Sequence, residues 1–232
     1  MVGGDGSLNE VVNGRRDLPI AVIPRGTGMD FARTHGIPSA FDDAVRVVLN
    51  GRFRDIDLGW VSFREGAGWF ANVASVGMSG AVAHRANSMS KALGGRVTFY
   101  AALVREFVGW SNTEVTVRLE DGITRTGRMH DVIVANGQWH GAGMWLAPDA
   151  RADDGRFDVI LIGDITKLDF VTTSPKLYKG TYLSHPKVEL LHSATVAVEA
   201  ADPLPIETDG EIAGTTPARF EIVPRALRVR AP

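Results

Sequence analysis

The residues with the clearest chemical potential lie at the start of the chain, in a glycine turn that leads into a helix. The turn reads Gly3-Gly4-Asp5-Gly6-Ser7. Three glycines in four positions are not typical of a strand or helix interior, and glycine lets a ligand approach the backbone closely. Such a turn before a helix presents free N–H groups and the positive end of the helix dipole, which suits phosphate. Asp5 would repel phosphate, so we expect it to act through magnesium or bound water.

The helix after this turn is predicted to begin at Ser7. Ser7 and Glu10 have the spacing of a capping box, and Gly14 is placed to end the helix. One apolar face follows at helical spacing, formed by Leu8, Val11 and Val12. From these residues alone, an ordinary turn with a capped helix is an equally good interpretation.

Composition limits the class of protein. The chain has 232 residues, of which 44% are hydrophobic and 22% charged, with a net charge of −2. This balance is typical of a globular protein of one large or two small domains, without the basic field that nucleic acid would require. Cysteine is absent, which excludes disulfides and thiolate metal sites. No apolar run reaches the roughly 18 residues that span a bilayer. We therefore expect a cytoplasmic protein whose contact with any membrane is peripheral.

A second glycine turn repeats the first arrangement. The apolar run Ile20–Ile23 is typical of a buried parallel strand, and Arg25-Gly26-Thr27-Gly28 follows it. A helix is predicted from Met29, with Asp30 in its first turn. Thr27 is either a phosphate contact or the cap of this helix. A longer amphipathic helix, Ala40–Asn50, ends at Gly51, where we place a domain boundary.

From there the pattern is mainly that of strands. Residues 54–61 alternate as a half-buried strand does, 69–76 form another, and 114–120 alternate strictly before the hairpin turn Asp121-Gly122. One helix, at residues 90–108, interrupts the strands. The predicted fold class is therefore α/β plus mainly β.

Two acidic groups lie in this second part. Asp149, Asp153, Asp154 and Asp158 form a cluster whose spacing is not that of an EF-hand. It is either a metal site or an acidic hairpin turn. Asp209-Gly210-Glu211 places two carboxylates around a glycine. In an extended segment both would lie on one face, but the glycine also permits a turn. This motif is thus either a proton-transfer site or a solvated hairpin tip.

Five ordered motifs resemble one known family. GGDGSLNEVVNG at residues 3–14 resembles the GGDGT-x-NEV-x-NG signature of the diacylglycerol kinase catalytic domain family, which includes bacterial lipid kinases and sphingosine kinases. The second glycine turn is similar to that family's P-x-GT-(A/G)-ND-x-AR element, with Met29 where asparagine is usual. Residues 136–158, the stretch from Lys179 to Pro186, and Asp209-Gly210-Glu211 resemble three further family elements. The resemblance covers nearly the whole chain.

The resemblance implies an ATP-dependent lipid kinase that transfers the γ-phosphoryl group to a lipid hydroxyl such as that of diacylglycerol. The residues implied to bind the nucleotide are Gly3, Gly4, Asp5, Gly6, Ser7, Asn9, Thr27 and Asp30. Asp5 would hold Mg²⁺ through water, and Asp209 or Glu211 would accept the hydroxyl proton. Asp154, with the backbone carbonyls of Arg151 and Arg156, would hold a structural Mg²⁺.

The implied architecture has two parts, with the active site between them. Residues 1–51 would be the remnant of a nucleotide-binding α/β domain, and 52–232 a β-sandwich-like domain. The family's phosphate loop normally follows about two βα units, so we expect this chain to be truncated at its N-terminus. A homodimer is left open. Two other functions also stay open: an NAD kinase-like enzyme with a soluble substrate, and a non-catalytic remnant that binds nucleotide or lipid.

Overall fold

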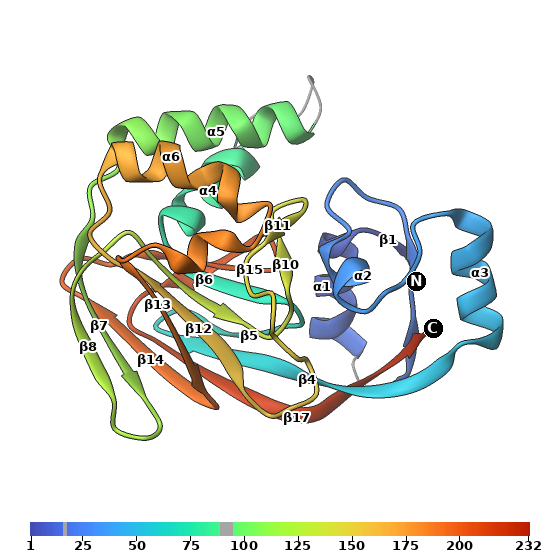
Figure 1. Cartoon of the computed structure of the whole chain (residues 1–232). Helices are drawn as coiled ribbons and strands as arrows, with labels where there is room; N and C mark the ends of the chain where they lie inside the picture. The colour runs from blue at the N-terminus through green and yellow to red at the C-terminus, as the bar shows by residue number, and fades with distance from the viewer. Residues whose placement is uncertain (16–17, 89–94) are drawn as a thin grey trace.

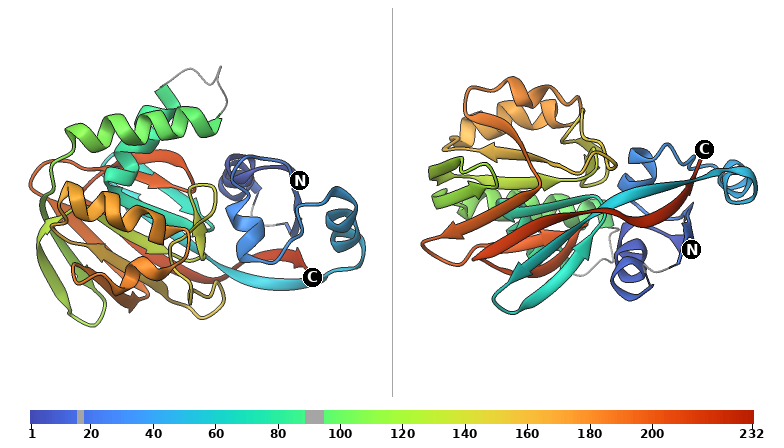
Figure 2. Two further views of the ribbon diagram at one scale, coloured as in Figure 1. Left: turned by 45° about the horizontal axis from the view of Figure 1, so that its top comes forward. Right: turned by 90° about the horizontal axis from the view of Figure 1, so that it is seen from below.

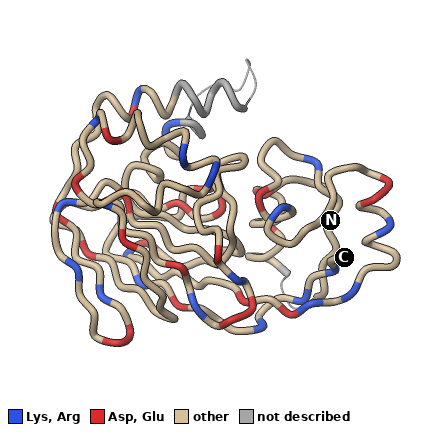
Figure 3. Tube along the Cα trace, viewed as in Figure 1, with Lys and Arg blue, Asp and Glu red and all other residues tan. Residues whose placement is uncertain are grey.

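The structure, a computed structural model, describes residues 1–15, 18–88 and 95–232. Figure 1 shows a small lobe, which contains both termini, beside a larger lobe of sheets covered by helices. The predicted helix 90–108 is present as α5 (Gly95–Gly109), and the first residues of that prediction lie outside the described ranges. No helix in these ranges is long and apolar enough to cross a bilayer. Acidic and basic residues are interspersed along the trace (Figure 3).

The small lobe is built from short elements around the two glycine turns. They are β1 (Val2–Gly3), α1 (Asp5–Arg15), β2 (Ile20–Ala21), β3 (Ile23–Pro24), α2 (Asp30–Thr34) and α3 (Phe41–Asn50). The predicted single strand at 20–23 is two strands with different parallel partners, because β3 pairs with β1 and β2 pairs with β17 (Ala218–Ala231). The predicted bounds of the first helix are wrong. Helix α1 begins two residues early, with Leu8 N–H donating to the carbonyl of Gly4, and continues through Gly14.

The large lobe contains two mainly antiparallel sheets. The six-stranded sheet has the order β13-β12-β9-β6-β15-β16, and the longer sheet has the order β5-β4-β17-β14-β7-β8. The strands of the first are β6 (Val73–Gly77), β9 (Asp131–Ala135), β12 (Phe157–Ile162), β13 (Val188–Ser193), β15 (Pro205–Thr208) and β16 (Glu211–Thr215). Those of the second, besides β17, are β4 (Arg52–Phe63), β5 (Gly66–Phe70), β7 (Thr113–Leu119), β8 (Thr124–Met129) and β14 (Thr195–Ala200).

Side-chain alternation explains the three layers of this lobe. One face of the six-stranded sheet contributes Val132, Val134 and Val159 to the core between the sheets. Its other face packs under helices through Ile133 and Ile160. Strands β9 and β12 are therefore buried on both faces, which accounts for their continuous apolar runs. The covering elements are α4 (Met78–Ser88), α5, α6 (Lys167–Leu177) and the short 3₁₀ helix Thr181–Ser184. Figure 2 shows them on the side opposite β4 and β17. The expected β-sandwich-like part is thus confirmed.

Two long strands join the lobes. The start of β4 and the end of β17 pair with each other beneath the small lobe, where Ile56 and Leu227 pack with Leu8 and Val12 of α1. The predicted half-burial of 54–61 is therefore wrong in its centre, although Ile56 and Leu58 do lie on one side. Residues 56–59 are all buried, because the small lobe covers one face of β4 there and the large lobe covers the other. The boundary near Gly51 coincides with the start of β4 and stays a prediction.

Asp57 shows how this junction is tied together. Its side chain is buried in the middle of β4, and its two carboxylate oxygens accept the backbone N–H groups of Gly155 and Arg225, each at 2.8 Å. A buried carboxylate is tolerated where backbone donors satisfy it. Asp57 therefore links β4 to the acidic turn before β12 and to the irregular centre of β17.

Gly59 is predicted to be a stability determinant. It pairs across the strands with Phe70, whose ring fills the space where a Gly59 side chain would lie, and Phe70 also packs on Phe157 at 5.6 Å between ring centroids. Gly59→Ala should lower the free energy of unfolding by about 1–3 kcal/mol through overpacking. Gly66→Ala, in the same hairpin, adds a methyl 3.7 Å from Phe63 and should change it by less than about 0.5 kcal/mol. Equal urea-unfolding curves for the two variants would contradict this explanation.

Candidate active site

The two glycine turns predicted to bind phosphate touch each other. Arg25 donates its N–H to the carbonyl of Gly3 at 2.8 Å. A Cβ built on Gly26 would lie 2.7 Å from the Cα of Gly4, and one on Gly4 would lie 3.1 Å from the Cα of Gly26. Any larger residue at either position would push the turns apart. Glycine at positions 4 and 26 is thus required for contact between the two turns.

Asp5 bridges these turns through the N-terminus of α2. Its Oδ1 accepts the N–H of Phe31 at 3.1 Å, and its Oδ2 accepts that of Asp30 at 3.2 Å. The carboxylate thereby satisfies two donors that the helix itself leaves unpaired. The alternative that Thr27 caps this helix is wrong, because α2 begins at Asp30 and its N-cap residue is Met29, with φ of 57°. Thr27 is exposed instead and lines the cavity described below.

The Asp209-Gly210-Glu211 motif is a tight turn between β15 and β16. Asp209 and Gly210 have φ of 51° and 92°. The turn sends the two carboxylates in different directions. Asp209 is buried and accepts the N–H groups of Ala71, Asn72 and Val73 at 2.8, 2.9 and 3.1 Å. Burial raises the pKa of Asp209 to about 6, against the lowering effect of these three donors. Glu211 is exposed, with its Oε1 3.3 Å from where a Gly6 side chain would begin.

A buried carboxylate that the sequence analysis missed holds this turn. Glu207 is almost fully buried, and its Oε1 accepts the N–H of Gly210. Its Oε2 accepts the hydroxyl of Ser75 at 2.8 Å and lies 3.3 Å from Nε2 of His140. His140 is in β10 (Trp139–His140), which pairs with β11 (Met144–Trp145). The available signal was a glutamate two residues before the acidic motif.

The charge of His140 follows from its neighbours. Burial lowers its pKa, but the attraction and hydrogen bond of Glu207, with further attraction from Asp30 and Asp209, outweigh burial and raise it to about 9. His140 is therefore an imidazolium at neutral pH. Asp30, whose pKa burial raises, accepts the N–H of Ala142 at 2.8 Å and an N–H of Arg33 at 2.6 Å. This links α2 of the small lobe to the hairpin that carries His140.

Most of these groups border one cavity of about 1450 Å³. Its polar end is lined by both glycine turns and by the groups just described: Gly4, Asp5, Gly6, Thr27, Asp30, His140, Glu207, Asp209 and Glu211. It continues under the helices, where the lining is largely apolar and includes Met78, Val82, Leu103, Ile133 and Phe170. The structure thus brings together most of the predicted site residues. Gly3, Ser7 and Asn9 are not among its lining residues.

The predicted metal residues lie elsewhere, in the turn before β12. Asp154 is exposed, and its Oδ1 accepts the N–H of Arg156 at 3.1 Å, while Arg151 contacts Asp153 at 3.3 Å. None of Asp154, Arg151 and Arg156 lines the cavity. No group of three or more His, Cys, Asp or Glu side chains suited to a metal ion is present in the described parts of the chain. Because the predicted site needs one carboxylate and two backbone carbonyls, it stays a prediction.

Comparison with known proteins identifies the family of this chain. Residues 1–61 match the family model of the diacylglycerol kinase catalytic domain, and residues 72–231 match the YegS C-terminal NAD kinase beta sandwich-like domain. A diacylglycerol kinase of Staphylococcus carnosus is 30% identical, and the match covers all of this chain and 76% of that protein. The chain belongs to the diacylglycerol kinase family. Its members are kinases, so ATP is the implied phosphoryl donor.

Other relatives extend the comparison. Proteins called diacylglycerol kinase from Bacillus subtilis and Mycobacterium tuberculosis are 29% and 28% identical, and each match covers 76% of the relative and 99% or 100% of this chain. A crystal structure of a diacylglycerol kinase from Bacillus anthracis superposes with a TM-score of 0.72 at 18% identity. The superposition covers all of this chain and 75% of that one. This likeness shows that the fold is shared.

His140 predicts a dependence of stability on pH. Its pKa is raised from 6.5 to about 9 in the folded protein, so its stabilising effect is present below pH 6.5 and is lost as pH rises through 9. The free energy of unfolding should therefore fall by up to about 3 kcal/mol between pH 6.5 and 9.5. His140→Gln should abolish most of this slope in urea unfolding, and His84→Gln, at an exposed position, should retain it. Parallel slopes in wild type and His140→Gln would contradict the assignment.

Proposed function

We propose that this protein is an ATP-dependent lipid kinase that transfers the γ-phosphoryl group to the hydroxyl of a lipid. One observation carries the proposal: a single cavity runs from the two glycine turns to an apolar interior. A phosphate-binding end and an apolar end in one space match the two halves of such a reaction, a nucleotide and an acyl chain. Asp209 and Glu211 line its polar end, together with the glycine turns.

The apolar interior is the feature that favours a lipid over a soluble substrate. Side chains from α4, α5 and α6, among them Val82, Leu103 and Phe170, form its wall. An acyl chain would gain more from burial against this wall than the polar dinucleotide of an NAD kinase-like enzyme would. A non-catalytic remnant is disfavoured by the number of buried, fully partnered carboxylates around the acidic turn, since these stabilise one geometry of the site.

The contacts favour Glu211 over Asp209 as the proton acceptor. All of the hydrogen bonds of Asp209 hold the backbone of residues 71–73, which suits a positioning role. In the proposed step, Glu211 accepts the proton of the lipid hydroxyl while the hydroxyl oxygen of the lipid forms a bond to the γ-phosphorus. The bond from that phosphorus to the β–γ bridging oxygen breaks, and ADP leaves. The glycine turns orient the phosphates, and Mg²⁺ bound with ATP would neutralise their charge.

We further propose that the enzyme acts at a membrane surface. Exposed apolar side chains gather on the helices that roof the cavity: Val104 and Val108 on α5, Leu168 and Val171 on α6, and Tyr178 just after α6. Exposed apolar residues on neighbouring helices are typical of contact with lipid. They lie beside the apolar part of the cavity, so a chain could pass from the bilayer into it.

The central test uses the whole chain with ATP, Mg²⁺ and diacylglycerol in mixed micelles. Glu211→Gln should lower kcat by at least about a hundredfold because it removes the proton acceptor. ATP affinity should stay unchanged, since the residue acts only on the lipid hydroxyl. Glu114→Gln, on the exposed face of β7, should behave like wild type. Phosphorylation of NAD in place of any lipid would reject the proposal, and wild-type turnover in Glu211→Gln would reject the role of that residue.

A separate test concerns the proposed Mg²⁺ at Asp154. Mg²⁺ should raise the melting temperature of wild type, and Asp154→Asn should remove that shift, because an amide oxygen binds the ion weakly. Asp121→Asn is a matched control. Asp121 also accepts the N–H of the second residue after it, Ile123, at 3.0 Å, but lies in a different turn. An identical Mg²⁺ shift in all three proteins would count against the site.

A further inference from the structure

Asp131 is a buried carboxylate in the cavity wall that no step proposed above uses. It is the first residue of β9 and only 4% exposed. Its Oδ2 accepts the N–H of Ser79 at 3.1 Å and also the hydroxyl of Ser79, which fixes the start of α4. Its Oδ1 is buried and has no hydrogen-bond partner among the residues that the structure describes. Half of this carboxylate therefore lacks a hydrogen-bond donor in the described structure.

The position of Asp131 relates it to the acidic turn. Glu207 pairs with Ser75, and Asp131 pairs with Gly77, two residues further along β6. Because side chains two apart on a strand share a face, Asp131 lies on the same face of the sheet as Glu207. That face is the floor of the cavity. Asp131 thus lies further along β6 than Glu207, beside the start of α4.

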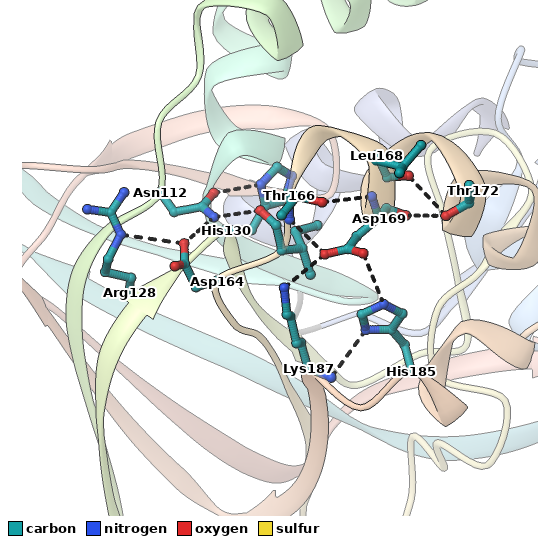
Figure 4. A network of polar contacts seen from close by, with 11 residues as sticks. Asn112, Arg128, His130, Asp164, Thr166, Leu168, Asp169, Thr172, His185 and Lys187 are labelled. Carbon is teal, nitrogen blue, oxygen red and sulfur yellow. Dashed lines mark hydrogen bonds and ion pairs between the residues drawn. The ribbon is translucent and has the colours of Figure 1, made fainter.

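His130 supplies a second unpaired atom. Its ring is 6% exposed, and Nδ1 lies 3.0 Å from Oδ1 of Asn112. The amide nitrogen of Asn112 donates to Asp164 and to the carbonyl of Ile165, so its Oδ1 is an acceptor and His130 Nδ1 must carry the proton (Figure 4). Burial lowers the pKa of His130 to about 4, which keeps the ring neutral. Nε2 is then an acceptor, and it too lacks a partner within the described ranges.

Both residues line the same cavity. We propose that Asp131 and His130 form a subsite that binds a hydrogen-bond donor of the lipid, a hydroxyl or an ammonium group other than the hydroxyl that is phosphorylated. The proposal rests on the lipid kinase function above and names the substrate class more closely. A buried acceptor left without a donor is costly, so a substrate that supplies donors is favoured over one that does not.

This chemistry separates lipids of similar size. A diacylglycerol has one hydroxyl, which is the reacting group, and two esters that only accept hydrogen bonds. Its esters could not donate a hydrogen bond to Asp131 Oδ1 or His130 Nε2. A monoacylglycerol has a second hydroxyl, and a long-chain amino alcohol has an ammonium group. The carboxylates that line the cavity would favour the ammonium further.

The experiment compares three lipids in mixed micelles: dioleoylglycerol, monooleoylglycerol and a C18 2-amino-1-alcohol. Burial raises the pKa of Asp131 to about 7, so the work is done at pH 8, where the carboxylate is ionised. Wild type should prefer at least one donor-bearing lipid over dioleoylglycerol by tenfold or more in kcat/KM. If monooleoylglycerol and the amino alcohol are both preferred, a hydroxyl donor is sufficient. If only the amino alcohol is preferred, the subsite binds an ammonium group.

Variants test the two residues. Asp131→Asn can still accept from Ser79 but presents an amide donor in place of Oδ1, so it should lose the preference at least tenfold and gain activity on dioleoylglycerol. His130→Phe keeps a ring of similar size and should weaken the same preference, which provides a second test if Asp131→Asn folds poorly. Asp158→Asn is the matched control. Asp158 also has a buried oxygen without a partner in the described chain but does not line the cavity, and its variant should keep the wild-type preference.

Lipid binding without ATP separates failure of this subsite from failure of the kinase proposal. Trp110 lies 6.5 Å from the His130 ring between centroids, so its fluorescence should report an occupied subsite. If no lipid is phosphorylated but Asp131→Asn still reverses the binding preference, the kinase proposal fails and the subsite stands. Equal kcat/KM and equal binding affinity of wild type for the three lipids would overturn the proposed subsite. An unchanged preference in both Asp131→Asn and His130→Phe also overturns it, because buried water would then be the partner of these atoms.

Discussion

The carboxylate of Asp209 is the interaction on which the geometry of the site most depends. It accepts three consecutive backbone N–H groups, at residues 71–73, from a loop more than a hundred residues away in sequence. These residues connect β5 of the longer sheet to β6 of the other, so the contact fixes the acidic turn relative to both sheets. Charged hydrogen bonds of this kind are stronger than neutral ones. The exposed Glu211 owes its position to its buried neighbour.

Glu207 is a second buried carboxylate at the acidic turn, and its charge explains why His140 is protonated. Glu207 accepts the N–H of Gly210. An isolated ionised carboxylate at this buried position would cost free energy of desolvation. His140 supplies the balancing charge at 3.3 Å. Such a pair adds little net stability compared with apolar packing, and its better-attested use is to specify one arrangement. The pair also couples the acidic turn to the small lobe, because the hairpin of His140 donates to Asp30 through Ala142.

Local pattern was enough to predict the fold class, α/β plus mainly β, but not the interior of the site. Alternation and turn residues reveal strands such as β7, because they depend on neighbours in sequence. The start of α1 was missed because a glycine such as Gly6 counts against a helix, whereas here it lies in the first turn. Glu207 and His140 meet across 67 residues, and no local pattern predicts that contact. The cavity could not be predicted either, since its wall comes from two lobes and three helices.

The route between the lobes has a mechanical consequence. They are joined by β4 and β17, which pair almost continuously from one lobe to the other, and not only by a flexible linker. A two-stranded ribbon is twisted more strongly than a wider sheet. Contacts from α2 to the large lobe, such as Thr34 Oγ1 to Asn72 at 3.0 Å, restrain that twist at the edge of the cavity. The register of β4 and β17, together with these contacts, therefore sets the distance between the glycine turns and Glu211.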